Sequence, residues 1–317
     1  MTRPVLFLVG PTGSGKTQVS LCLAKRLGCE IISADSMLVY RGMDVGTAKP
    51  LPSERKKVRH HLMDIVAPRS NFSVHEHRGL ALKALQKILK RKRIPLIVGG
   101  SGLYVDAIWK GLSPHPRGDL KLRRELKERL EKKGLEFLYR ELKKMDPYRA
   151  GRIHPHDERR ILRALEIAKL SGRPASEGDQ KKTPLEDLGY SVKVYGIARD
   201  RAELYERINQ RVQKMFEQGF FQEVKKLRRK RFSTTARQAL GYRELLHHLK
   251  CGGKSVSPAL IQEIQQKTRQ FAKRQLTWFR REKEIHWIFW GSGETARQVC
   301  DKISSDAKSW LETEHCL

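Results

Sequence analysis

The feature that most constrains this chain is a glycine-rich segment near its start, Gly10-Pro11-Thr12-Gly13-Ser14-Gly15-Lys16-Thr17. It follows an apolar run at residues 5–9 and precedes a stretch with helical periodicity, the strand–loop–helix context that a phosphate-binding loop requires. In such a loop, backbone N–H groups and the helix N-terminus surround an anion, the lysine reaches a terminal phosphate, and the last hydroxyl can ligate Mg²⁺. We therefore expect this segment to bind a phosphate group, with Lys16 touching it and Thr17 as the metal ligand.

Further apolar runs alternate with helical stretches along the chain, at residues 31–34, 62–66, 94–98, 192–198 and 285–290. This alternation is typical of parallel strands that are buried on both faces and joined by crossover helices. The first crossover helix is expected at residues 16–27, where Val19, Leu23 and Leu27 recur every fourth position and Gly28 can end the helix. The predicted fold class is α/β, with a P-loop NTPase-like parallel sheet as its core.

Strand-like runs disappear between residues 114 and 188, where apolar residues recur at helical spacing. Loop-forming residues flank this segment on both sides. We interpret residues 114–188 as a mainly helical insertion, and residues 1–113 and 189–317 as the α/β core with its C-terminal helices. After Asp200 we expect three long helical stretches, including residues 258–281, where most of the shared apolar face is hydrophobic core.

The charge balance indicates a polyanionic partner. The 317-residue chain has 65 Lys and Arg residues against 35 Asp and Glu, a formal net charge of +30. So large an excess favours nucleic acid as the first partner to consider, with a merely solvated basic surface as the alternative. No apolar run is long enough to cross a bilayer, so we expect no membrane contact.

The five cysteines are odd in number, widely spaced and without a C-x-x-C pair, a pattern that argues against a disulfide framework and against a zinc site. The neighbouring histidines His60 and His61, and His154 and His156, have no cysteine partners that would indicate zinc. A reducing, cytoplasmic location is expected.

Asp35 is the first candidate for chemistry beyond phosphate binding. It follows the apolar run 31–34, at the carboxyl end of the second expected strand, where open α/β sheets bind their ligands. The alternative is that its carboxylate only caps a turn. The phosphate loop itself does not identify the phosphate compound. The N-K-x-D base reader of GTPases and a helicase-type acidic box are both absent, so a kinase of nucleotides or small metabolites stays open.

Six segments, in this order, resemble the signatures of the tRNA dimethylallyltransferase family, also called tRNA isopentenyltransferases or IPP transferases. The resemblance spans roughly residues 4–290. After the phosphate loop come residues 35–50 (DSMLVYRGMDVGTAKP), 98–104 (VGGSGLY), 157–166 (DERRILRALE), 239–242 (ALGY) and 272–280 (AKRQLTWFR). The chain departs from the family pattern at Leu38 and Arg159, where glutamine is usual, and at Ser101, where threonine is usual.

The resemblance implies transfer of a dimethylallyl group from dimethylallyl diphosphate to the exocyclic N6 amine of the adenine 3′ of the anticodon, in tRNAs that read codons beginning with U. Asp35 would be the catalytic base, Lys16, Thr17 and Arg211 would act on the diphosphate together with Mg²⁺, and Arg207 is the other candidate arginine. The insertion would contact the anticodon stem-loop. The residues that the resemblance places against tRNA are Asp35, Ser36, Met37, Leu38, Ser101, Arg123, Arg159, Arg160, Ile161, Leu162 and Arg163.

A cytoplasmic, monomeric enzyme is expected, with tRNA and dimethylallyl diphosphate as partners. Three alternatives remain beside it. A P-loop kinase would consume ATP, a non-catalytic RNA-binding protein would not need Asp35, and an isopentenyl transferase acting on free AMP would need neither the insertion nor so high a charge.

Overall fold

The computed structural model describes residues 3–179, 181–229 and 231–315. The chain divides into two compact units. We call Met1–Trp109 with Leu185–Leu317 the core unit, and Lys110–Pro184 the insertion unit. The insertion unit thus occupies residues 110–184, compared with the expected 114–188. Each unit is described separately below.

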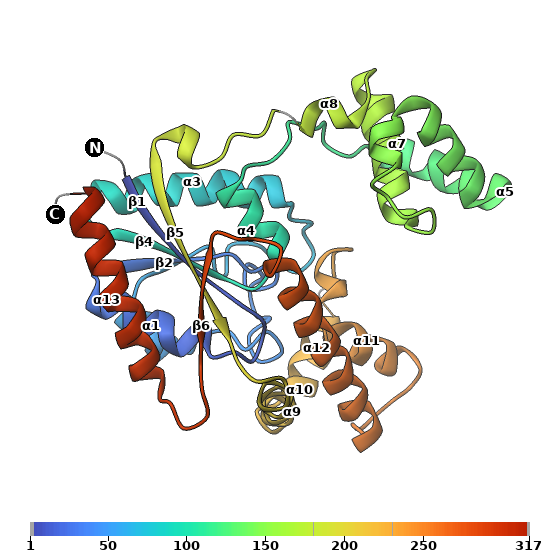
Figure 1. Cartoon of the computed structure of the whole chain (residues 1–317). Coiled ribbons are helices and arrows are strands. Elements are labelled where there is room, and N and C mark those ends of the chain that lie inside the picture. The colour runs from blue at the N-terminus through green and yellow to red at the C-terminus, as the bar shows by residue number, and fades with distance from the viewer. Residues whose placement is uncertain (1–2, 180, 230, 316–317) are drawn as a thin grey trace. The chain divides into compact units, whose positions relative to one another are not determined.

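A parallel sheet of six strands forms the centre of the core unit, in the order β3-β2-β4-β1-β5-β6 (Figure 1). The prediction of an α/β parallel-sheet core is confirmed. The strands are β1 (Arg3–Val9), β2 (Cys29–Ser33), β3 (His60–His61), β4 (Ile94–Gly99), β5 (Tyr190–Ala198) and β6 (Ile285–Phe289).

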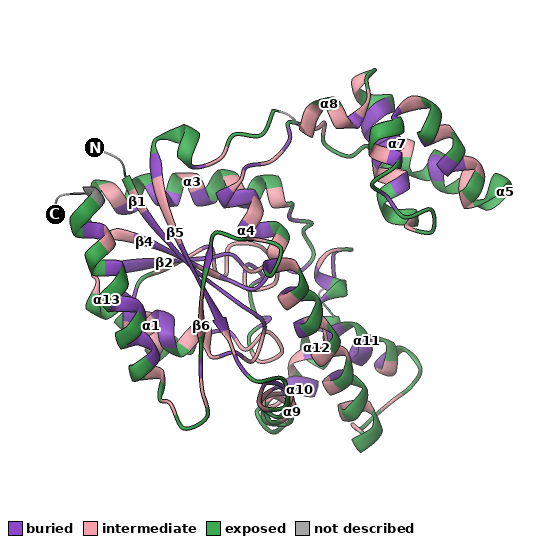
Figure 2. Cartoon of the chain, in the orientation of Figure 1, coloured by how far each residue is buried: buried purple, intermediate pink, exposed green. Residues whose placement is uncertain are grey.

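Both faces of the sheet are covered by helices, which explains why the central strands β1 and β4 are almost entirely apolar (Figure 2). Alternate residues of β1 point to opposite faces. Val5 and Phe7 pack with residues of α3 (Val74–Lys90) and α4 (Gly102–Trp109). Leu6 and Leu8 pack with residues of α1 (Lys16–Arg26) and α13 (Ala296–His315). Helix α1 ends one residue before the expected position, and Gly28 follows with a φ of +66°.

The expected strand at residues 62–66 is wrong. The strand at this edge is His60–His61, which follows the short helix α2 (Pro52–Lys57). Leu62 and Asp64 have φ values of 63° and 55°, which an extended strand cannot accommodate. Asp64 is held there by ion pairs with Lys49 and Arg55, both at 2.6 Å. The apolar pattern of residues 62–66 could not predict these ion pairs, because Lys49 and Arg55 lie outside that segment.

The described residues between Asp200 and β6 form four α-helices: α9 (Arg201–Glu217), α10 (Phe220–Arg228), α11 (Tyr242–Lys250) and α12 (Pro258–Phe279). They bury a separate hydrophobic cluster together with the segment that follows β2. Its members include Val39, Tyr40, Phe220 and Tyr242. The segment after β2 is therefore packed against elements from the last third of the chain.

A disulfide joins Cys22 in α1 to Cys300 in α13, with the two Cα atoms 6.2 Å apart. The expectation that spacing argues against disulfides is wrong for this pair. Because 278 residues separate the two cysteines, only the packing of α13 on α1 brings them together. Cys29 and Cys251 are free, and Cys316 lies outside the described residues.

The insertion unit is built from α5 (Leu120–Met145), α6 (Pro147–Ala150), α7 (Glu158–Ser171) and α8 (Ala175–Asp179). Helix α5 is interrupted at Gly134, whose φ of 78° is not helical. The hydrophobic core of the insertion unit includes Leu126, Leu138 and Ile161. Among the described helices of the chain, none is sufficiently long and apolar to span a membrane.

Candidate active site

The carboxyl ends of the central strands meet at one edge of the sheet because the strands are parallel. The order of the strands brings together Gly10 after β1, Asp35 after β2, Ser101 after β4 and Arg199 after β5. The sheet thus assembles at one edge three segments that the sequence singled out separately.

The phosphate loop has the backbone that its glycines allow. Gly10, Gly13 and Gly15 have φ values of 143°, 82° and 96°. A Cβ on Gly10 would lie 2.7 Å from the Ile197 carbonyl oxygen, and one on Gly15 would lie 2.5 Å from the Trp290 ring. Helix α1 begins at Lys16, and the residue before it, Gly15, provides no side-chain cap. Its first amides are therefore available to an anion, together with the partial positive charge of the helix terminus.

Gln275 of α12 connects the phosphate loop to the turn after β4. Its Oε1 accepts a hydrogen bond from the Thr12 amide at 2.8 Å, and its Nε2 donates to the Gly100 carbonyl at 2.7 Å. Gly100 permits this contact, because a Cβ there would lie 2.6 Å from Gln275 Nε2. A single buried amide side chain thus fixes two loops of the site relative to each other.

Two arginines brace the phosphate loop through its carbonyl groups. Arg199 Nε donates to the Ser14 carbonyl and Arg207 Nε to the Gly13 carbonyl, both at 3.1 Å. Trp290, directly after β6, stacks with Arg199 at 3.7 Å and packs on Gly15. With the carbonyl groups turned towards these arginines, the loop keeps its amides for the ligand.

Lys16, Arg211 and Asp35 form the electrostatic centre of the site. Burial and, next, the positive charge of Arg211 together lower the pKa of Lys16 to about 7, against the opposing effect of the Asp35 charge. Burial also lowers the pKa of Arg211, again opposed by Asp35. Arg211 Nη2 donates to the Thr47 carbonyl at 3.4 Å, and Lys16 Nζ to the Pro11 carbonyl at 2.6 Å. Two poorly solvated cations that repel each other are suited to a ligand with several negative charges.

Asp35 caps a turn and keeps one oxygen available. Its Oδ1 accepts hydrogen bonds from the amides of Met37 and Leu38, at 2.8 and 3.3 Å. The turn-capping alternative is therefore realised. Among the residues that the structure describes, no hydrogen bond uses Oδ2. The two roles are compatible, because the cap orients the carboxylate and leaves a second oxygen for a substrate.

Ser101 joins the turn after β4 to the segment after β2. The Ser36 amide donates to Ser101 Oγ at 3.3 Å, and the two hydroxyl oxygens lie 3.4 Å apart. Met37 and Leu38 are half-buried beside them. The five candidates Asp35, Ser36, Met37, Leu38 and Ser101 thus lie at the same edge of the sheet as the phosphate loop.

The expected RNA contacts of the insertion unit have different environments. Arg123 and Arg163 both donate to the carboxylate of Glu166, with their shortest bonds at 2.7 and 2.6 Å. Arg159 and Arg160 are exposed at the start of α7, where Arg160 lies 3.4 Å from Asp157. Ile161 is fully buried in the core of the insertion unit and Leu162 packs against that core. Ile161 therefore has no side-chain surface for RNA, and its expected contact with tRNA stays a prediction that only its backbone could meet.

The metal expectation can be tested against the donor atoms. Within residues 3–179, 181–229 and 231–315, no group of three or more His, Cys, Asp or Glu side chains could hold a metal ion. Mg²⁺ does not require one, because it commonly takes one or two protein oxygens, substrate phosphates and water. Thr17, at the start of α1 beside the uncapped amides, offers such an oxygen. The residues present fit a Mg²⁺ ion that arrives with a diphosphate.

Sequence reasoning missed Gln275, Trp290 and Arg199 as parts of the site. Gln275 stood on the apolar face of residues 258–281, which we interpreted mostly as core. A polar side chain on such a face was the available signal, since buried amides need partners. Trp290 and Arg199 gave no comparable signal, because their contacts depend on β5 and β6 ending beside β1.

Comparison with known proteins gives consistent results. The family model described as IPP transferase matches residues 38–282. The tRNA dimethylallyltransferase of Natranaerobius thermophilus is 43% identical over 95% of this chain and 91% of its own length. The solved tRNA isopentenylpyrophosphate transferase of Bacillus halodurans is 38% identical, with a TM-score of 0.71, and 99% of this chain and 98% of that one are covered.

A solved eukaryotic dimethylallyltransferase, described as acting on tRNA, is 28% identical, with a TM-score of 0.78 over 97% of this chain and 80% of its own. Both the sequence and the fold therefore agree with the resemblance in the six segments. The chain belongs to the IPP transferase family.

Proposed function

We propose that this protein transfers the dimethylallyl group of dimethylallyl diphosphate to the N6 amine of the adenine 3′ of the anticodon, in tRNAs that read codons beginning with U. The observation that carries the proposal is the grouping of Lys16, Arg211 and Asp35 at the edge of the sheet. Two cations and a phosphate loop suit a diphosphate, and a carboxylate beside them suits removal of a proton.

Asp35 is the proposed base. An adenine amine is a weak nucleophile because its lone pair is delocalised into the ring, so it gains from a group that accepts its proton as the new bond forms. Asp35 Oδ2, which accepts no hydrogen bond from the residues that the structure describes, can take that role while Oδ1 is held by the amides of Met37 and Leu38. The carboxylate can therefore take the proton without losing its orientation.

The remaining charge develops on the diphosphate, which leaves as its bond to the allylic carbon breaks. The amides at the start of α1, Lys16 and Arg211 would stabilise that charge, a contribution of several kcal/mol in comparable sites. Mg²⁺ bound to Thr17 and to the diphosphate would add neutralising charge. The loop carbonyls do not oppose this, because Arg199 and Arg207 bind two of them.

Recognition of the RNA requires that the adenine leave the stacked anticodon loop so that its amine can reach the Asp35 carboxylate. Ser36, Met37, Leu38 and Ser101 are the proposed contacts near the reacting amine. The insertion unit is the proposed contact for the anticodon stem-loop, with Arg159 and Arg160 as its exposed arginines. The net charge of +30 supports such a partner.

The test is transfer of a labelled dimethylallyl group from its diphosphate into unmodified tRNA with Mg²⁺ present. Label should enter tRNA without ATP and should not enter free AMP. ATP hydrolysis without labelled tRNA would contradict the proposal and favour a kinase. Label in AMP but not in tRNA would favour a transferase of free nucleotides.

A further inference from the structure

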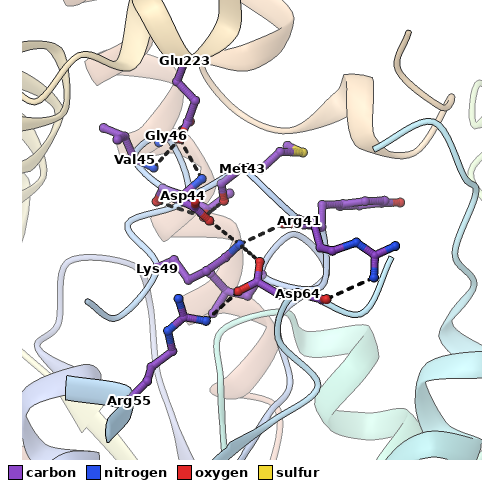
Figure 3. A network of polar contacts seen from close by, with 12 residues as sticks. Arg41, Met43, Asp44, Val45, Gly46, Lys49, Arg55, Asp64 and Glu223 are labelled. Carbon is purple, nitrogen blue, oxygen red and sulfur yellow. Dashed lines mark hydrogen bonds and ion pairs between the residues drawn. The ribbon is translucent and has the colours of Figure 1, made fainter. Parts of the chain in front are cut away.

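A tight turn at residues 43–49 follows the segment of Asp35, and Glu223 of α10 holds it in place (Figure 3). Glu223 Oε2 accepts hydrogen bonds from the amides of Asp44 and Val45, both at 2.8 Å. Its Oε1 accepts from the Gly46 amide at 3.2 Å. One carboxylate thus accepts hydrogen bonds from three consecutive backbone amides, although it belongs to an element nearly 180 residues away.

Glu223 is itself fixed by its surroundings. The hydroxyl of Tyr242, a fully buried residue at the start of α11, donates to Glu223 Oε1. Burial and the charge of Glu223 raise the pKa of Tyr242, so the hydroxyl keeps its proton and remains a donor. Gly46 packs against this pair, because a Cβ there would lie 2.0 Å from the Phe220 ring and 2.6 Å from the Tyr242 ring. The carboxylate therefore has little freedom to move.

Lys49 holds the same turn from within. Its buried ammonium donates to the Tyr40 carbonyl at 2.8 Å and to the carboxylates of Asp44 and Asp64, both at 2.6 Å (Figure 3). The Thr47 hydroxyl donates to the Met43 carbonyl at 2.6 Å. Hydrogen bonds to charged groups are among the stronger ones in proteins, so the turn is a rigid support.

What this turn supports is Arg211. The Thr47 carbonyl accepts the hydrogen bond from Arg211 Nη2, and the charge of Arg211 acts on Lys16. Glu223 touches none of the candidate reacting groups among the described residues. We propose that Glu223 is a positioning residue for diphosphate binding: it places the Thr47 carbonyl, which in turn holds Arg211 beside Lys16. This inference rests on the proposed function, in which Arg211 binds the diphosphate.

The experiment compares wild type with Glu223→Gln, which keeps the size of the side chain but loses its charge and one acceptor. Binding of inorganic diphosphate with Mg²⁺ is measured by calorimetry, and KM and kcat are measured with dimethylallyl diphosphate. We expect the diphosphate Kd and the KM for the diphosphate substrate to rise together by about tenfold, because charged hydrogen bonds that support Arg211 are lost. The KM for tRNA should change little.

The matched control is Glu141→Gln in the insertion unit. Glu141 accepts two hydrogen bonds from Arg129, the shorter at 2.6 Å, and has no part in the turn. This control should leave the diphosphate Kd unchanged. Tyr242→Phe removes only one donor from Glu223 and serves if Glu223→Gln does not fold. A smaller rise in the same Kd is expected, and an unchanged Kd in this folded variant would overturn the proposal.

A double-mutant cycle with Arg211→Met separates positioning from general loss of structure. If Glu223 acts through Arg211, Glu223→Gln should weaken diphosphate binding no further in the Arg211→Met background. The full tenfold loss in that background would overturn the proposal, as would unchanged binding in a folded Glu223→Gln protein. Failure of the proposed function gives a different result, namely wild type that binds diphosphate but transfers no dimethylallyl group to tRNA.

Discussion

Two carboxylates in this molecule lie among arginines and are used in opposite ways. Glu166 in the insertion unit accepts hydrogen bonds from the Asp119 amide, Arg123 and Arg163, so both of its oxygens are occupied. Burial pushes the pKa of Glu166 up, but the bonds from Arg123 and Arg163 hold it below its usual value. Within the described part of the chain, Asp35 in the core unit accepts hydrogen bonds on Oδ1 alone, from backbone amides, while Arg211 binds the Thr47 carbonyl.

The difference separates structural charges from charges that can act on a ligand. Arg123 and Arg163 share one carboxylate with 2% of its side chain exposed, which compensates one of their two positive charges and ties both arginines to the packing of the insertion unit. Arg211 and Arg207 bind carbonyl oxygens, which orients a guanidinium without cancelling its charge. Whether an arginine near a site can act on a ligand is therefore better predicted from its hydrogen-bond partner than from its position in a motif.

The largest effect is expected at Asp35. Asp35→Asn keeps the acceptor for the Met37 amide but cannot take up a proton, so turnover should fall on the order of a hundredfold or more while tRNA binding persists. Single-turnover transfer and tRNA binding are measured on the same preparation. Asp35→Ala should lose as much turnover and also loosen the turn. Lost tRNA binding with a normal single-turnover rate would contradict the base assignment.

The comparison is tested directly by a matched pair, Arg211→Met and Arg123→Met. Arg211→Met should raise the KM for dimethylallyl diphosphate by roughly thirtyfold with little change in Tm, since a charge-assisted contact to the ligand is lost. Arg123→Met should lower Tm, because it leaves the buried Glu166 with one arginine fewer, and should leave that KM unchanged. If both variants changed KM and Tm in the same way, the distinction between the two regions would be wrong.

A smaller, pH-dependent effect is expected from Lys16. Its pKa is lowered to about 7, whereas a bound diphosphate favours the charged form, so binding above pH 7 must take up a proton. Affinity for inorganic diphosphate should therefore fall as pH rises above 7, by up to about tenfold per pH unit. Calorimetry in buffers of different ionisation enthalpy measures the uptake. Lys16→Arg, whose side chain stays charged, is the control. If this variant took up the same proton on binding, the uptake would belong to another group.

The smallest effect is expected at the exposed arginines of α7. Arg159→Ala and Arg160→Ala should each weaken tRNA binding by only about two- to fivefold and reduce its salt dependence, as for contacts to phosphate. Tm should not change, in contrast to Arg123→Met. Binding measured over a series of salt concentrations tests this, and an unaltered salt slope would place the RNA contact elsewhere.

The sequence predicted those parts of the molecule whose signals are local. The phosphate loop and the position of Asp35 after β2 depend on neighbouring residues, and both lie where the strand and helix patterns placed them. The strand expected at residues 62–66 is absent because Asp64 is held by Lys49 and Arg55. An apolar pattern does not contain that information.

The contacts that could not be predicted join residues far apart in the chain. Glu166 reaches Arg123 over 43 residues, and Cys22 reaches Cys300 over 278. The roles of the individual RNA and metal residues, Ile161 included, stay predictions. Spacing can suggest which residue types take part, but the pairing of charges follows from packing.

The dependence of the phosphate loop on Gln275 and Trp290 has a consequence for biosynthesis. Chains fold from the N-terminus as they leave the ribosome, so the glycine-rich loop emerges long before the side chains that brace it. Thr12 and Gly15 lack these partners until α12 and the end of β6 have been made. A nascent chain therefore carries the loop sequence without its finished shape, and the braced form of the loop is reached only after Trp290 has been made.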